Sequence, residues 1–74
     1  MRVRIPNDIQ ATPEHYDILA GEWECDPHVW DEGRAVGIKG VRLRGRVQGY
    51  GWWHCNIRQE VFDVYLTEGK IQEA

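Results

Sequence analysis

The sequence predicts a mainly β domain, a small antiparallel meander curled into a barrel, with one short N-terminal helix. In residues 41–48 apolar or small residues occupy every odd position and polar residues every even one, which is the period of a strand with one solvated face. Glycine-containing turns separate this segment from the strand-like segments after it. Strands joined in succession by short turns indicate an antiparallel meander.

The size and composition of the chain limit what it can do. Its 74 residues form a single domain (1–74), and a domain this small buries only about 60% of the surface of its unfolded chain, so a deep active site is not expected. No apolar run approaches the roughly 18 residues of a membrane helix, and residues 1–6 lack the apolar stretch of a secretory signal. Two cysteines without an export signal are expected as reduced thiols. These features favour a cytoplasmic protein that does not bind membranes.

The first third of the chain is expected to hold one strand and one helix. Residues 2–5 alternate charged and apolar side chains, which predicts a short edge strand. Residues 12–14 (Thr-Pro-Glu) form a helix start signal, because they supply a capping hydroxyl, a proline suited to the first turn and an acid at the positive end of the dipole. The helix would end at Gly21, and a strand at residues 16–19 is the alternative.

Further segments complete the predicted meander. The apolar residues change from even to odd positions near Gly40, so we expect a glycine-assisted bulge or bend there. In residues 52–58 the odd positions are expected to face inward, which places Trp53 in the core. Residues 61–66 are expected to form another strand, and residues 70–72 a short last one.

The meander and its hinge glycines give the chain a resemblance to known small barrels. Residues 34–73 resemble an SH3-like barrel, and the five-stranded oligonucleotide-binding (OB-like) barrel is the second choice. The resemblance concerns architecture, rests on no diagnostic motif and carries over no functional residue.

The two halves of the chain carry opposite charge. Residues 6–32 contain eight acidic residues and no Lys or Arg, whereas residues 34–58 contain six basic residues and no acid. The chain therefore divides into an acidic half (1–33) and a basic meander (34–73), a division that the net charge of −3 conceals.

The basic meander holds the candidate binding surface. Arginines at every second position of one strand project from the same face, roughly 6.5 to 7 Å apart, and their planar guanidinium groups bind carboxylates or phosphates bidentately. An exposed tryptophan beside arginine is typical of interface hot spots. We therefore predict that the outward face of two adjacent strands binds a partner. Its residues are Arg42, Arg44, Arg46, Trp52, His54 and Arg58.

Several alternatives are open for this surface. The arginines can instead pair with the chain's own acids, namely Glu60, Asp63 or those of the acidic half, as cross-strand ion pairs commonly do. Trp52 can equally lie buried beneath the N-terminal segment. The same face can bind nucleic acid, but the sequence pI of about 5.5 favours a protein partner with an acidic surface. The oppositely charged halves also leave a homodimer open.

The cysteines and histidines raise two further hypotheses. Cys25 and His28 flank a proline turn and have the spacing of two zinc ligands, which Cys55 or His54 could complement; the alternative places both cysteines in the core. A thiol activated by an imidazole is the second hypothesis, and only the co-occurrence of the residues supports it. No phosphate loop, nucleophile elbow or dinucleotide motif is present, so neither an enzyme nor a bound cofactor is expected.

These features predict a non-enzymatic protein-binding module, with a nucleic-acid-binding barrel and a zinc-stabilised domain as alternatives. Small size, halves of opposite charge and the lack of a catalytic motif suit a compact accessory or inhibitor protein, such as those of phages and mobile elements.

Overall fold

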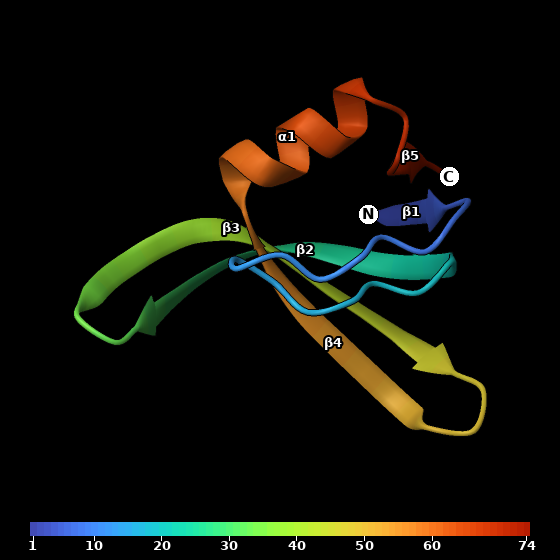
Figure 1. Cartoon of the computed structure of the whole chain (residues 1–74), viewed down its shortest axis with the longest axis horizontal. Helices are drawn as coiled ribbons and strands as arrows, with labels where there is room; N and C mark the ends of the chain where they lie inside the picture. Colours follow the sequence, from blue (N-terminus) through green and yellow to red (C-terminus); the bar gives the residue numbers. More distant parts are fainter.

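A computed structural model describes all 74 residues and shows a five-stranded antiparallel sheet with one helix against it (Figure 1). The mainly β class predicted from the sequence is therefore confirmed. The elements are β1 (Arg2–Ile5), β2 (Gly21–Glu32), β3 (Ala35–Val47), β4 (Gly51–Arg58), α1 (Gln59–Thr67) and β5 (Gln72–Glu73). Helix α1 has nine residues and is too short to span a membrane.

The sheet stays open and does not close into a barrel. The strand order is β4-β3-β2-β1-β5, so β4 and β5 form opposite edges. Strand β1, expected at an edge, lies instead between β2 and the two-residue strand β5. The expected SH3-like or OB-like closure is therefore not confirmed. The chain leaves β4 as a helix, and no long strand remains to join the two edges.

One face of the sheet carries the hydrophobic core. Side chains alternate along the strands, and those on the inward face pack beneath α1 and the segment between β1 and β2 (Figure 1). The sheet contributes Val3, Ile5, Trp23, Cys25, Val41, Leu43, Cys55 and Ile57, and the covering segments contribute Ile9, Ile18, Phe62, Tyr65 and Ile71. Burial of this apolar surface is the main driving force for folding, and it leaves the other face of the sheet to solvent.

The segment expected as a strand at 61–66 lies within helix α1, so that prediction is wrong. A strand would place Phe62 and Val64 on the same inward face, but Phe62 and Tyr65 are buried while Val64 is 51% exposed. Burial at positions three apart is the helical period. Gly69, with a φ of 76°, follows the helix end in the left-handed conformation that glycine favours there. Short apolar runs fit both periods, and packing against the sheet selects the helix.

The helix expected to start at Thr12 does not form. The segment between β1 and β2 instead doubles back on itself through two isolated bridges, of which the outer joins Ile9 and Ile18. At its tip the Thr12 hydroxyl accepts a 3.1 Å hydrogen bond from the Glu14 backbone N–H, in a tight turn with Pro13 at its second position. Threonine and proline suit a turn as well as a helix start, and the hairpin lets both isoleucines reach the core.

Gly40 lies where the sequence predicts a bend in β3. Gly40 and Val41 are neighbours and both buried, so the alternation of faces is interrupted here. A Cβ at Gly40 would meet the carbonyl oxygen of Ile57 and lie 2.9 Å from Cη2 of Trp30. The pairing irregularity lies nearer the start of β3, between the pairs Trp30–Ile38 and Glu32–Ala35, where β3 has one residue more than β2. The absence of a side chain at Gly40 allows the three strands to approach this closely.

Replacing Gly40 by alanine is expected to lower the free energy of unfolding by about 1–3 kcal/mol, because the added methyl group meets backbone that cannot move aside. Urea unfolding followed by tryptophan fluorescence measures the change. Val36→Ala in the same strand is the control, because Val36 is 80% exposed. Equal unfolding midpoints for Gly40→Ala and the natural protein would contradict the close packing.

Candidate functional site

The outward face of the sheet carries charged side chains in columns of alternating sign. Arginines project from β1 and β3, and the strand between them, β2, presents carboxylates. The residues are Arg2 and Arg4 on β1, Glu22, Glu24 and Asp26 on β2, and Arg42, Arg44 and Arg46 on β3. In one row across the sheet Arg2 lies opposite Glu24, Glu24 opposite Arg44, and Arg44 opposite His54. Each basic column therefore has an acidic neighbour.

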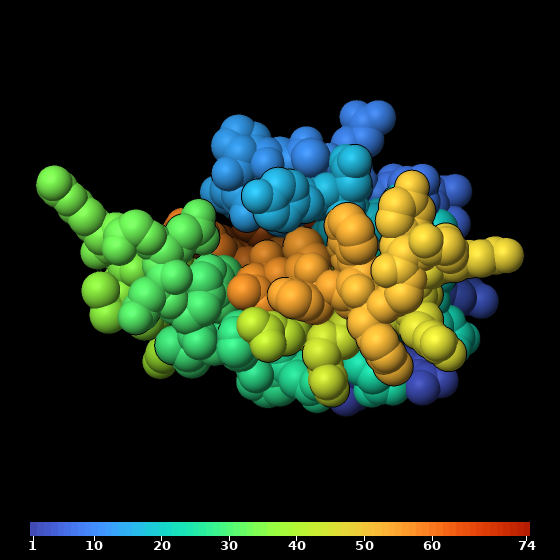
Figure 2. All heavy atoms as spheres, turned by 90° about the horizontal axis from the view of Figure 1, so that it is seen from below, coloured from blue at the N-terminus to red at the C-terminus, as the bar shows by residue number.

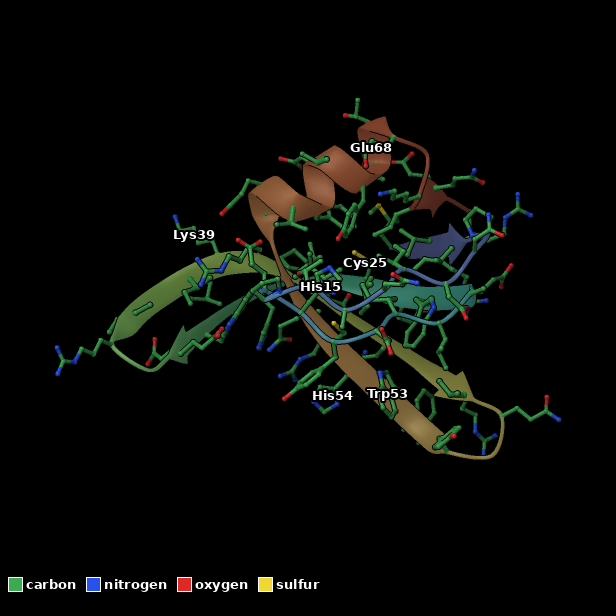
Figure 3. The ribbon with its side chains drawn as sticks, in the orientation of Figure 1. His15, Cys25, Lys39, Trp53, His54 and Glu68 are labelled. Atoms are coloured by element: carbon green, nitrogen blue, oxygen red, sulfur yellow. The ribbon has the colours of Figure 1, made fainter.

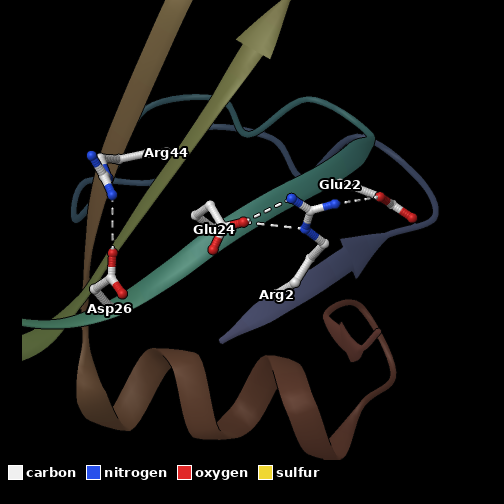
Figure 4. A network of polar contacts seen from close by, with 5 residues as sticks. All are labelled: Arg2, Glu22, Glu24, Asp26 and Arg44. Atoms are coloured by element: carbon white, nitrogen blue, oxygen red, sulfur yellow. Dashed lines mark hydrogen bonds and ion pairs between the residues drawn. The ribbon is translucent and has the colours of Figure 1, made fainter.

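Ion pairs connect part of this face (Figure 4). Arg2 Nη2 lies 2.8 Å from Glu24 Oε1, and Arg2 Nη1 lies 3.6 Å from Glu22 Oε2. Arg44 Nη2 lies 3.3 Å from Asp26 Oδ2. All five side chains are about half exposed, and exposed pairs add little to stability and are screened by salt. The pairs order the face without making its charges inaccessible.

The three arginines of β3 have different partners. Arg44 forms the ion pair with Asp26 of β2, which is the pairing within the chain that the sequence leaves open. Arg42 is half-buried, and its Nε donates a 3.1 Å hydrogen bond to Oδ1 of Asn56. The guanidinium carbon of Arg46 lies 5.9 Å from the ring centroid of Trp52. Arg46 makes no ion pair, so its charge is available to a partner.

The exposure of one tryptophan, Trp53, departs from expectation. Trp23 is buried and Trp52 is 74% exposed, so Trp52 is not covered by the N-terminal segment. Trp53, expected in the core, is 36% exposed. Trp53 and His54 lie on the half of β4 that extends away from α1 (Figure 3), so the inward face has less cover there. Tyr50 contacts the Trp53 ring edge-on, with the ring centroids 6.2 Å apart.

The residues predicted to bind a partner all lie on β3 or β4. The register places Arg46 opposite Trp52 and Arg44 opposite His54, so four of them form two adjoining pairs. Arg58 ends β4, at the opposite end of that strand from Trp52, and makes no ion pair. The strand pairing thus gathers the predicted face around Arg46 and Trp52.

A groove that the sequence does not predict runs along the free edge of β4. Two hollows of about 510 and 670 Å³ lie between β4 and the segment before β2, and they adjoin because both are lined by Ala11, Tyr16 and His54. Figure 2 shows β4, in orange, uncovered across the middle of one side of the molecule, beside the blue N-terminal segment. Tyr16 is 81% exposed and comes beside β4 only through the fold. No local pattern in the sequence indicates that proximity.

The four zinc candidates do not come together. Cys25 and Cys55 are free thiols buried on the inward face of the sheet. His28 stacks on Trp30 with ring centroids 5.9 Å apart, and His54 is exposed on β4. No group of three or more His, Cys, Asp or Glu side chains is placed to hold a metal ion.

The environment of both thiols opposes nucleophilic chemistry. Burial raises the pKa of Cys25 and of Cys55 above the ordinary value of 9.0. The N-terminal amino group opposes the shift at Cys25, and the backbone N–H of Tyr16 opposes it at Cys55. A raised pKa keeps the thiol neutral, whereas the thiolate is the reactive form. The thiol and imidazole hypothesis therefore gains no support from the geometry.

The cysteines of the folded protein are expected to react with Ellman's reagent at pH 8 roughly tenfold or more slowly than those of the unfolded chain, because burial limits both access and ionisation. The folded pKa is raised, so the stability that the neutral thiols contribute is present below about pH 9 and is lost as the pH rises above it. Rapid labelling of both thiols under native conditions would contradict this environment.

A buried polar pair fastens the segment before β2 to helix α1. His15 Nδ1 donates a 2.6 Å hydrogen bond to the carbonyl oxygen of Tyr16, which leaves Nε2 to accept one from the Tyr65 hydroxyl, also at 2.6 Å. Burial raises the pKa of Tyr65, with Lys70 opposing the shift. Figure 3 shows His15 on the segment that crosses the sheet below α1. The pair fixes the position of the chain that lines the groove.

Tyr65→Phe is expected to lower the free energy of unfolding by about 1–3 kcal/mol, because the buried His15 Nε2 loses its hydrogen-bond partner while the ring is retained. Urea unfolding measures the change. Tyr16→Phe is the matched control, because the Tyr16 hydroxyl is exposed and has no hydrogen bond within the protein. If Tyr65→Phe lowers the free energy of unfolding no more than Tyr16→Phe does, the hydrogen bond between His15 and Tyr65 does not stabilise the fold.

Comparison with known proteins identifies no family for the chain. A scan against protein-family models found no match, and searches of curated proteins and of solved structures found none either.

Proposed function

We propose that the chain is a non-enzymatic protein-binding module that docks the outward face of β3 and β4 onto an acidic surface. One observation carries the proposal. Trp52 is 74% exposed, and the guanidinium carbon of Arg46 lies 5.9 Å from its ring centroid without any ion pair to an acid of the chain. An exposed indole in contact with an unneutralised guanidinium is the composition of an interface hot spot.

In this proposal Trp52 is the anchor, and the arginines set the register and the association rate. Arg46 and Arg58 offer their charge without releasing an internal partner, so they attract carboxylates at the lowest cost. Arg44 must exchange Asp26 for a carboxylate of the partner, which costs little because the pair is exposed. Arg42 is held by Asn56 and contributes mainly to the shape of the face. The docking energy is therefore centred on one end of the strand pair.

Nucleic acid is the second candidate for the same face. The contact of Arg46 with Trp52 favours it, since single-strand binders combine cations with aromatic stacking platforms. The carboxylates of Glu24 and Asp26 disfavour it, because they lie opposite Arg44 and Arg42 and would repel a phosphate backbone. A protein partner agrees better with the alternating columns, because its carboxylates can be spaced to contact the arginines and to avoid Glu24 and Asp26.

The proposal includes a cytoplasmic location and the role of a small accessory or inhibitor protein. The two cysteines support the location, because both are unpaired and buried rather than joined as a disulfide. A compact domain with a groove at one edge and a charged face leaves binding, rather than catalysis, as the proposed activity.

Arg46→Glu and Trp52→Ala are each expected to weaken binding of a fluorescent decaglutamate peptide roughly 5- to 30-fold, as removal of a hot-spot side chain does. Fluorescence anisotropy at low salt measures the affinity. Arg34→Glu is the matched control, because it makes the same change of charge in the turn between β2 and β3, away from the proposed face.

Equal losses for Arg46→Glu and Arg34→Glu would contradict a specific face, since they would show that only net charge matters. Tighter binding of decathymidylate than of the peptide would instead support the nucleic-acid hypothesis. The logarithm of its affinity would then fall against the logarithm of the salt concentration by about 0.7 for each phosphate contacted.

A further inference from the structure

The free edge of β4 is a second surface. It adjoins the arginine face (Arg42, Arg44, Arg46, Trp52, His54 and Arg58) at Trp52 and His54. Because β4 is the last strand of the sheet, one edge of its eight residues has no neighbouring strand. No backbone group of Gly51–Arg58 takes part in any backbone hydrogen bond outside the regular elements. A long edge with free N–H and C=O groups is a template for a further strand.

The chain does little to protect this edge. Natural proteins shield exposed edges with very short strands, prolines or charged side chains. The opposite edge, β5, is only two residues long. Strand β4 contains no proline and no lysine, its single charged residue is the terminal Arg58, and it carries the exposed Trp52. The sequence of β4 therefore leaves a strand edge open where protection would be expected.

The groove along this edge has a defined chemical character. Three acidic side chains and several aromatic ones line its two hollows, which contain no Lys or Arg. The acids are Glu14, Asp17 and Glu32, and the aromatic residues include Tyr16, Trp52 and Trp53. Grouped carboxylates attract cations, and the faces of indole and phenol rings bind guanidinium and ammonium groups. The charge of the groove is thus opposite to that of the arginine face.

We infer that the free edge of β4 binds an extended basic segment of a partner protein, which adds a sixth strand to the sheet. Main-chain hydrogen bonds to β4 provide affinity, and alternate side chains provide specificity. The cationic side chains enter the groove towards Glu14 and Asp17, and the apolar ones lie on the outward side beside Trp52. Strand β3, in which arginines alternate with apolar residues, pairs with the other edge of β4, but its arginines lie on the outward side, so the added strand presents the opposite face.

This inference goes beyond the proposed function and does not depend on it. The two surfaces select partners of opposite charge, and Tyr16 and Glu14 belong only to the groove. The groove depends on the position of the segment before β2, which the bond between His15 and Tyr65 holds against α1.

The test uses a blocked octapeptide with the sequence of residues 41–48 as the probe. Its control has the three arginines replaced by glutamate. We expect the arginine peptide to bind at low salt, measured by fluorescence anisotropy, at least about tenfold more tightly than the glutamate peptide. Nuclear magnetic resonance is expected to show slowed amide exchange in β4 when the arginine peptide is bound, because a sixth strand satisfies its free backbone groups.

Tyr16→Ala and Glu14→Gln test the groove itself. Each is expected to weaken binding of the arginine peptide roughly two- to fivefold, as loss of one exposed cation–π contact or ion pair does. Tyr50→Ala is the matched control, because Tyr50 is similarly exposed and contacts Trp53 but does not line the groove. Urea unfolding of each variant confirms that it is folded.

Several results would overturn the inference. They are absence of binding up to millimolar arginine peptide, equal affinity for both peptides, a loss for Tyr16→Ala no larger than for Tyr50→Ala, and no change of amide exchange in β4. Arg46→Glu is expected not to weaken binding of the arginine peptide. Failure of the edge site and failure of the arginine face are therefore distinguishable.

Discussion

The hydrophobic core lies against one face of the sheet, and this one-sided burial sets the positions of the charged face and of the free edge. Trp23, Leu43 and Ile57 belong to a core that α1 and the segment before β2 cover from one side. A cover on one side leaves the opposite face to polar side chains, because apolar groups there would remain in water. Since the chain forms a helix directly after β4, no long strand bridges the two edges, and the sheet stays open. The charged face and the free edge both follow from this arrangement.

Folding sorts the opposite charges of the two sequence halves into different places. Acids of β2, such as Glu24 and Asp26, lie between the arginine columns and moderate their repulsion. Other acids of the same half, including Glu14 and Asp17, line the groove at the edge of β4. The strand that carries Trp52 borders both regions, with the arginines on its outward side and the acids on its inward side. A small domain thereby presents two surfaces of opposite charge next to each other.

The groove is coupled to the core through a few close contacts. Hydrogen bonding of His15 to Tyr65 holds the N-terminal segment against α1, and the turn around Thr12 forms part of the groove wall. On the other side Gly40 lets Trp30 approach β4, and Trp30 also lines the groove. A substitution that weakens either contact is therefore expected to shift the residues that line the groove, because close-packed interiors transmit small displacements. Stability and the proposed edge site rest on the same residues.

Features that depend on local period can be predicted from the sequence alone. Alternation in residues 41–48 places three arginines on one side of a strand. Trp52 and Trp53 are neighbours in β4, so their side chains face opposite sides of the sheet. Packing selects the conformation of the short ambiguous segments: residues 61–66 form part of a helix, and the Thr-Pro-Glu signal forms a turn. It also determines the partial exposure of Trp53 and the approach of Tyr16 to β4. Those features arise from contacts between residues far apart in the chain, which no local pattern encodes.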